Sequence, residues 1–141
     1  IERYDRVDDA LHATRAALEE GVLPGGGIAL HTLGRKLMIP TDKEKSFTVG
    51  YRLLSDACSE PFKQILENAG LSHHKVLNKL AGEEFNAGYD VRNKKFGNMF
   101  ELGVSDPAKV IRCAIENAVS AATMLLLVDC SLIEINSDQN E

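Results

Sequence analysis

The chain has 141 residues, of which 44% are hydrophobic and 26% charged, and its formal net charge is −5. This length and composition predict one globular domain with a core of ordinary size. The negative charge argues against nucleic acid as the main partner, because proteins that bind nucleic acid carry a basic stripe. The longest apolar run, MLLLV at 124–128, is far shorter than the roughly 20 residues that a bilayer span needs, so we expect no membrane segment.

Cysteine and histidine usage predicts no metal site. Cys58, Cys113 and Cys130 are widely spaced and lack metal-ligand spacing, so we interpret them as small buried apolar side chains in a reducing compartment. His73 and His74 are adjacent, and neighbouring helix positions point about 100° apart, so the pair would need further ligands to hold an ion.

The first predicted element is an amphipathic helix over residues 3–20. Apolar residues from Val7 to Leu18 recur at helical spacing, whereas Asp9 lies on the opposite face, beside alanines such as Ala13. Taken alone, Asp9 is either an ordinary solvated side chain or a carboxylate that can enter a cleft. The helical pattern starts at once, without a cap, which predicts that the chain is a piece of a longer protein.

Pro24 and three glycines, Gly25, Gly26 and Gly27, interrupt the helical pattern. Three consecutive glycines indicate either a sharp turn or the close approach of a ligand to bare backbone. The surrounding sequence lacks the context of a phosphate-binding loop, so the motif alone favours a hinge. A further helix is expected over residues 28–37.

A run of short-looped helices follows a turn predicted at Pro-Thr-Asp. We expect one helix from Lys45 to Cys58, and a second that has Pro61 in its first turn and ends at Gly70. A third, short helix is predicted to be capped by Ser72 and ended by Gly82.

The last third of the chain changes pattern. Residues 85–99 alternate in polarity around a turn at Asn93, which predicts a small β-hairpin. Asp106 and Pro107 are typical of an N-cap and first position of a long helix, whose apolar residues predict the central core helix. The polar residues 134–141 are expected to fray or to pair with a neighbour. The fold class is therefore mainly α, a helical bundle with a small β-hairpin.

Two segments carry a family resemblance. DALHATRAALEEGVLPGGGIAL (9–30) and GYDVRNKKFGNMFELGVSDPAKVIRCAIENAVSAATML (88–125) closely resemble the group I chaperonins, the GroEL class. The resemblance covers nearly the whole chain, in order. It implies that residues 1–20 are the returning helix of the intermediate domain, and that residues 21–141 are the C-terminal half of the ATP-binding equatorial domain. It also implies that the other half of the equatorial domain would precede residue 1, together with the apical domain. That half would carry a Gly-Asp-Gly-Thr phosphate loop.

The resemblance implies an ATPase that drives protein folding. Rings of identical subunits would enclose unfolded client proteins, with a co-chaperonin as an optional partner, in the cytoplasm or in an organelle matrix. ATP and Mg²⁺ are the implied cofactors, with the metal ligands outside this segment. The isolated segment would be inactive and of poor stability, because its core would lack the other half of the domain.

Site residues follow from the resemblance position by position. Asp9 matches the aspartate that positions the attacking water, and Gly25 and Gly26 match glycines that pack against the sugar and base of the nucleotide. Val104 and Asp106 match positions that flank the base and the ribose. Helix capping already accounts for Asp106, so its ribose role would be an addition.

The hairpin departs from the family pattern. Tyr89 matches a residue that borders the adenine, but Asp90, Val91 and Arg92 stand where bacterial chaperonins commonly have Asn-Ala-Ala. The bulky charge of Arg92 supports a second hypothesis, a helical assembly module of chaperonin descent that no longer binds nucleotide. An unrelated helical enzyme finds no support, because the sequence has no Ser/His/Asp, Cys/His or metal constellation.

Overall fold

The computed structural model describes residues 2–37 and 44–130. Contacts divide the chain into two units, Ile1–Ile111 and Arg112–Glu141. The turn predicted at 40–42 and the tail predicted at 134–141 lie outside the described residues.

Five helices and two antiparallel two-stranded sheets make up the described part of the chain. The helices are α1 (Glu2–Glu20), α2 (Ile28–Lys36), α3 (Lys45–Asn68), α4 (His73–Leu80) and α5 (Ala108–Leu126). The strands are β1 (Val22–Pro24), β2 (Ala87–Asp90), β3 (Lys95–Asn98) and β4 (Ser105–Pro107). The mainly helical fold with a small hairpin is thus confirmed. No helix among these residues is both long and apolar enough to cross a membrane.

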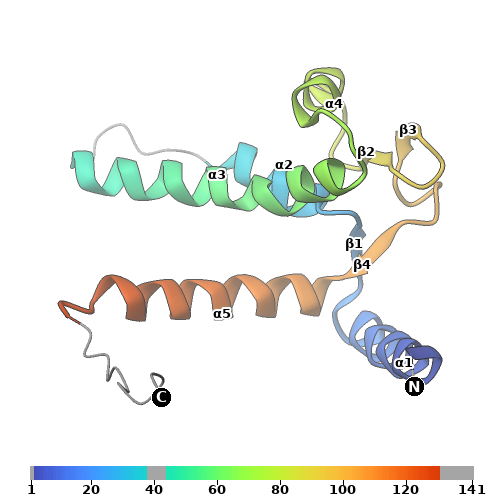
Figure 1. Ribbon diagram of the computed structural model, residues 1–141, viewed down its shortest axis with the longest axis horizontal. Helices are drawn as coiled ribbons and strands as arrows, with labels where there is room; N and C mark the ends of the chain where they lie inside the picture. Colours follow the sequence, from blue (N-terminus) through green and yellow to red (C-terminus); the bar gives the residue numbers. More distant parts are fainter. Residues whose placement is uncertain (1, 38–43, 131–141) are drawn as a thin grey trace, which may run out of the picture. The chain divides into compact units, whose positions relative to one another are not determined.

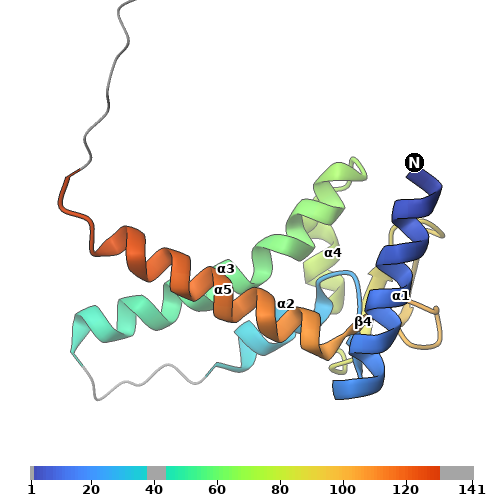
Figure 2. The same ribbon diagram turned by 90° about the horizontal axis from the view of Figure 1, so that it is seen from below.

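Helix α1 packs through its alanine face. Ala13, Ala16 and Ala17 are half-buried, whereas Val7 is 68% and Leu18 83% exposed. The helix lies beside β4 (Figure 2), and its Glu19 forms an ion pair with Lys109 Nζ in the first turn of α5. The small alanine side chains allow this close approach, and the larger apolar side chains of the helix stay exposed.

Strands β1 and β4 form a sheet that the sequence does not predict. They pair antiparallel, with Leu23 opposite Asp106 and Val22 opposite Pro107 (Figure 1). The predicted N-cap role of Asp106 is therefore wrong, because Asp106 and Pro107 belong to β4 and α5 begins at Ala108. The Ala108 N–H donates to the Gly21 carbonyl at 3.0 Å, so a strand partner from the start of the chain takes the place of a local cap.

Helix α3 runs unbroken through Pro61, where two helices are predicted. Proline removes one helical hydrogen bond and crowds the preceding turn, which normally breaks a helix. Here α2 packs along α3 on both sides of the proline. The Ser55 hydroxyl donates to the Gly34 carbonyl at 2.9 Å, and the His31 ring lies 5.6 Å from the Phe62 ring. This packing holds the helix axis continuous.

The structure confirms three further local predictions. Gly70 ends α3 at φ 71°, with the Leu71 N–H donating to the Leu66 carbonyl at 2.9 Å, as glycine-terminated helices do. Ser72 stands at the N-cap of α4, although its side chain makes no capping hydrogen bond. Strands β2 and β3 form the predicted hairpin.

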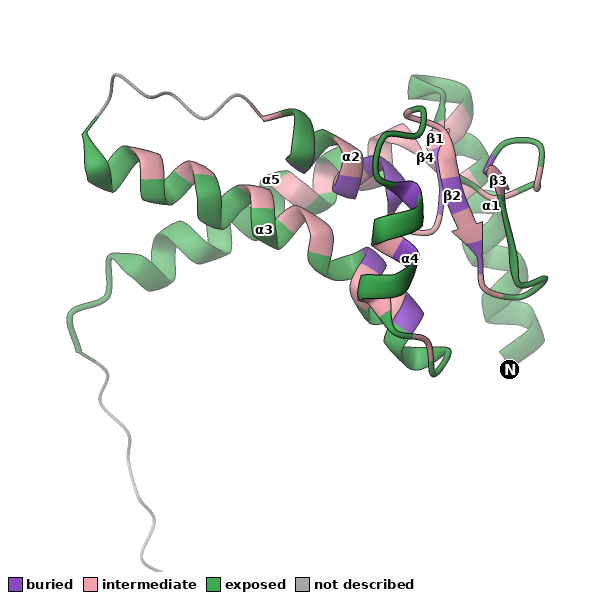
Figure 3. Ribbon diagram, turned by 90° about the horizontal axis from the view of Figure 1, so that it is seen from above, coloured by how far each residue is buried: buried purple, intermediate pink, exposed green. Residues whose placement is uncertain are grey.

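The core of the first unit lies between the C-terminal part of α3, α2, α4 and the hairpin (Figure 3). Its buried members are Ile28, Phe62, Leu66, Val76, Leu80 and Met99.

Helix α5 and the cysteines contradict predictions of burial. No residue of α5 is buried among the described residues, so the predicted central core helix is wrong for this chain. Apolar side chains are more stable when buried, but burial also needs a partner surface. Cys58 and Cys113 are half-buried and Cys130 is exposed, and all three are free.

Candidate functional site

The glycine turn after β1 is shaped by protein backbone on both sides. A Cβ on Gly25 would lie 3.0 Å from the Ser105 nitrogen, and one on Gly27 would lie 2.8 Å from the Phe62 nitrogen. Gly26 and Gly27 have φ of 67° and 80°, a region that L side chains rarely adopt. The three glycines therefore let β4 and α3 approach the turn, which is neither a bare hinge nor an open loop.

Strand β4 and the residue before it hold this turn in place. The Gly25 N–H donates to the Val104 carbonyl at 3.1 Å, and the Gly26 N–H donates to the Asp106 carboxylate. Burial raises the pKa of Asp106, and the hydrogen bond from Gly26 offsets only part of that rise. Four residues that the resemblance assigns to the nucleotide, two from each side, are thus brought together.

Met99 connects the glycine turn to the hairpin. A Cβ on Gly26 would meet the Met99 Cε at 3.3 Å, and one on Gly88 would meet the Met99 sulfur at 2.5 Å. The Met99 carbonyl accepts the Val104 N–H at 2.8 Å. Met99 is 1% exposed and was not singled out from the sequence, where an isolated methionine after a strand carries no distinctive signal.

The hairpin turn uses Asp90 for its own structure. Its carboxylate accepts the Arg92 N–H at 2.9 Å, the Asn93 N–H at 3.2 Å and the Asn93 side-chain amide at 2.6 Å. The side-chain hydrogen bond from Asn93 is the largest cause that lowers the pKa of Asp90. The Asp90 side chain is buried, whereas Arg92 is exposed.

Tyr89, Val91 and Val104 also serve the core. All three are half-buried and pack against its buried members, and the Tyr89 ring lies 4.6 Å from the Phe96 ring. Packing alone accounts for the residue types at these three positions, as it does for the glycines, without any contribution from a ligand.

Asp9 stands apart from this group. It lies in the middle of α1, exposed, on the face that carries the half-buried Ala13 and Ala16. No hydrogen bond or ion pair joins it to the other assigned residues in the described part of the chain. Among the same residues, no group of three or more His, Cys, Asp or Glu side chains is arranged to hold a metal ion.

A buried histidine is a further polar feature that the sequence analysis did not single out. His31 is 7% exposed, and its Nδ1 lies 3.0 Å from the Ser59 hydroxyl, which joins α2 to α3. Burial lowers its pKa, and the charges of Arg35 and Lys63 lower it further. Its helical spacing from Ile28 is the one signal in the sequence that places it on a buried face.

These helices, the hairpin and the glycine turn between them define a fragment of a chaperonin equatorial domain. A crystal structure of a group III chaperonin in the open state matches with a TM-score of 0.76 and 31% identity, covering 83% of this chain and 25% of that chain. The Chaperonin GroEL 3 of Psychromonas ingrahamii is 38% identical over 137 residues, which are 97% of this chain and 25% of that protein. The chain spans about a quarter of the length of these relatives.

Residues 1–135 match the TCP-1/cpn60 chaperonin family. The chain belongs to this family.

Proposed function

We propose that this chain supplies one wall of the nucleotide site in an ATP-driven chaperonin subunit. The observation that supports it best is the joining of Gly25 and Gly26 to Val104 and Asp106. These two pairs of residues lie about 80 positions apart in the sequence, near opposite ends of the first unit. Each residue matches a position that the family resemblance assigns to the base or the ribose. Residues 1–20 and 21–141 would then belong to the intermediate and equatorial domains.

The wall suits a sugar better than a metal ion. Asp106 accepts the Gly26 N–H, and a carboxylate has further acceptor sites for ribose hydroxyl groups. Gly26 presents backbone without a side chain. The family resemblance implies that the ligands of Mg²⁺ lie in the rest of the subunit.

Asp9 is proposed to orient the attacking water. Bound ATP supplies the phosphoanhydride bond that water cleaves. The exposed Asp9 carboxylate accepts a hydrogen bond from the water and takes up its proton at a carboxylate oxygen. A base positioned in this way typically raises the rate 10² to 10⁴-fold.

Asp9→Ala in the full-length protein tests this role. ATP hydrolysis should fall by about 10²-fold or more, while equilibrium ATP binding stays nearly unchanged. Asp8→Ala is the matched control, because Asp8 is the neighbouring aspartate on α1 and pairs instead with His12 at 3.7 Å. Unchanged turnover in Asp9→Ala would remove Asp9 from the mechanism.

The second hypothesis, an assembly module without nucleotide, is favoured by one observation. Arg92 is exposed at the hairpin turn, so its side chain is available to occupy the space where family members place an alanine. Equilibrium binding of ATP to the full-length protein and to Arg92→Ala separates the hypotheses. Binding by the wild type supports the ATPase, whereas binding only after Arg92→Ala supports the module.

The assembly itself is part of the proposal. Identical subunits would form a ring that encloses unfolded client proteins, and ATP hydrolysis would drive their release. Refolding of a denatured client by the full-length protein, with and without ATP, is the direct measurement. Refolding that does not respond to ATP would contradict the coupling.

A further inference from the structure

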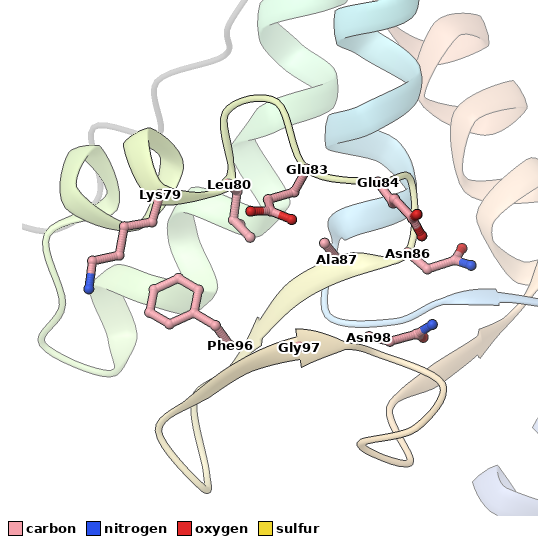
Figure 4. Close-up of a pocket in the computed structure, with 9 residues that line it drawn as sticks. All are labelled: Lys79, Leu80, Glu83, Glu84, Asn86, Ala87, Phe96, Gly97 and Asn98. Carbon is pink, nitrogen blue, oxygen red and sulfur yellow. The ribbon is translucent and has the colours of Figure 1, made fainter.

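A cavity of the first unit lies between α4 and the hairpin. Its volume is about 560 Å³, within the range of roughly 300–1,000 Å³ that small-molecule sites occupy. Figure 4 shows Lys79 and Phe96 at one end, and Glu84, Asn86 and Asn98 at the other. Its remaining lining residues are Leu80, Glu83, Ala87 and Gly97.

One end of this cavity presents an aromatic face to cations. Phe96 is 42% exposed, and the Lys79 ammonium lies 5.1 Å from the centre of its ring. This distance is that of a cation–π contact, in which the negative face of the ring attracts positive charge. The buried side chain of Leu80 adds apolar surface beside the ring.

The two glutamates of the cavity form no ion pair with the residues that the structure describes. Glu83 and Glu84 are exposed, and their carboxylates form no ion pair or hydrogen bond with other described residues. Lys79 is the single cation of the lining, so the lining is net negative. A smaller cavity of about 180 Å³ shares both glutamates and is also lined by Arg35 and Lys36, neither of which pairs with them in the described structure.

We propose that this cavity binds the guanidinium group of an arginine side chain. A guanidinium is planar, so it stacks on an aromatic ring, and its N–H fork donates two hydrogen bonds to one carboxylate. Phe96 supplies the ring, and Glu83, which lies between the two ends of the cavity, supplies the carboxylate. A lysine ammonium lacks the plane, and an anion is repelled. The site goes beyond the proposed nucleotide role and shares none of its assigned residues.

Titration calorimetry of the full-length protein with a capped Gly-Arg-Gly tripeptide tests the site. The tripeptide should bind saturably, and its citrulline counterpart, which keeps the shape but not the charge, should bind at least about tenfold more weakly. Free L-arginine is the second arm. Tighter binding of the tripeptide identifies a polypeptide segment as the source, and equal binding identifies the free amino acid.

Variants separate the cavity from general charge. Glu83→Gln and Phe96→Leu should each weaken tripeptide binding about threefold, whereas Glu101→Gln, an exposed glutamate outside the cavity, should leave it unchanged. Lys79→Met should tighten binding about fivefold, because it removes the cation that competes for the ring. No saturable binding, equal affinity for the citrulline peptide, or weaker binding by Lys79→Met would overturn the proposal.

Discussion

Three aspartates assigned to one nucleotide site have different surroundings in this chain. Asp9 is exposed on α1, Asp90 is buried and surrounded by donors, and Asp106 is half-buried beside a single N–H. The pKa of Asp90 is lowered and that of Asp106 is raised. Because the Asp90 carboxylate already accepts hydrogen bonds within the hairpin turn, any adenine contact there would come from the backbone or from its neighbours.

Because their surroundings differ, Asp90 and Asp106 contribute to stability in ways that change in opposite directions with pH. Asp90 favours the folded state while it is ionised, so its contribution is present above its ordinary pKa of 3.8 and is lost as the pH falls through its lowered value. Asp106, with a raised pKa, favours the folded state below 3.8, and that contribution is lost as the pH rises through the raised value.

His31 should make stability depend on pH in the weakly acidic range. Its pKa is lowered by burial, so the unfolded chain binds its proton more readily than the folded chain. Stability is therefore full above the ordinary value of 6.5 and falls as the pH drops below it. Thermal unfolding of the full-length protein should show this fall for the wild type and a smaller one for His31→Leu. His12→Leu, which removes an exposed histidine, is the control, and an equal response in all three would contradict the effect.

At the scale of elements, local signals predict most helices and fail where distant partners compete. The helical spacing of α1, the glycine end of α3 and the hairpin alternation are all properties of short windows, and the structure confirms them. Pro61 was expected to start a helix because the packing of α2 across it lies outside any such window. Asp106 and Pro107 were expected to begin a helix for the same reason, since their partners Leu23 and Val22 are remote in sequence.

The candidate site was less predictable than the fold. Sequence alone left Gly25 and Gly26 between hinge and ligand wall, and only the family resemblance joined them to Val104 and Asp106. The structure brings these four together, whereas the role of Asp9 stays a prediction. Contacts such as Met99 with Gly88 and Gly26 depend on tertiary packing that no motif records.

The contact between the glycine turn and α3 should be sensitive to substitution at Gly27. Gly27→Ala places a Cβ 2.8 Å from the Phe62 nitrogen at a φ of 80°, so backbone strain and overpacking act together. We expect a loss of about 3 kcal/mol in the free energy of unfolding of the full-length protein. Gly21→Ala is the matched control, because Gly21 has φ 83° but nothing within 4 Å of its Cβ position.

Gly21→Ala should cost only the strain of its backbone, about 1 kcal/mol. Chemical denaturation of both variants measures the difference directly. Equal losses would show that the approach of α3 to the turn contributes nothing.

At the scale of the whole molecule, apolar surface is left without a partner in this chain. Large apolar side chains are exposed on α1 and on the second unit, for example Leu18 at 83% and Leu126 at 86%. Each unit shows this separately, and exposed apolar surface of this kind marks contacts with other protein surfaces. The chain also spans only about a quarter of its relatives.

The segment 1–141, expressed alone, should therefore unfold over a broad temperature range and bind a hydrophobic dye. The full-length protein is the comparison, and it should show less dye binding for each residue of chain. Calorimetry and dye fluorescence measure both properties. A sharp cooperative transition of the segment, with little dye bound, would contradict this expectation.

The β1–β4 sheet has a consequence for the order of folding. It closes a loop that contains most of the first unit, and closing a long loop costs chain entropy that only later contacts offset. Contacts between α2 and α3, which are closer in sequence, carry a smaller cost and are favoured earlier. The glycine turn, which needs Val104 and Asp106 to hold its shape, is then among the last features to form. Any ligand that this turn binds would report on completed folding.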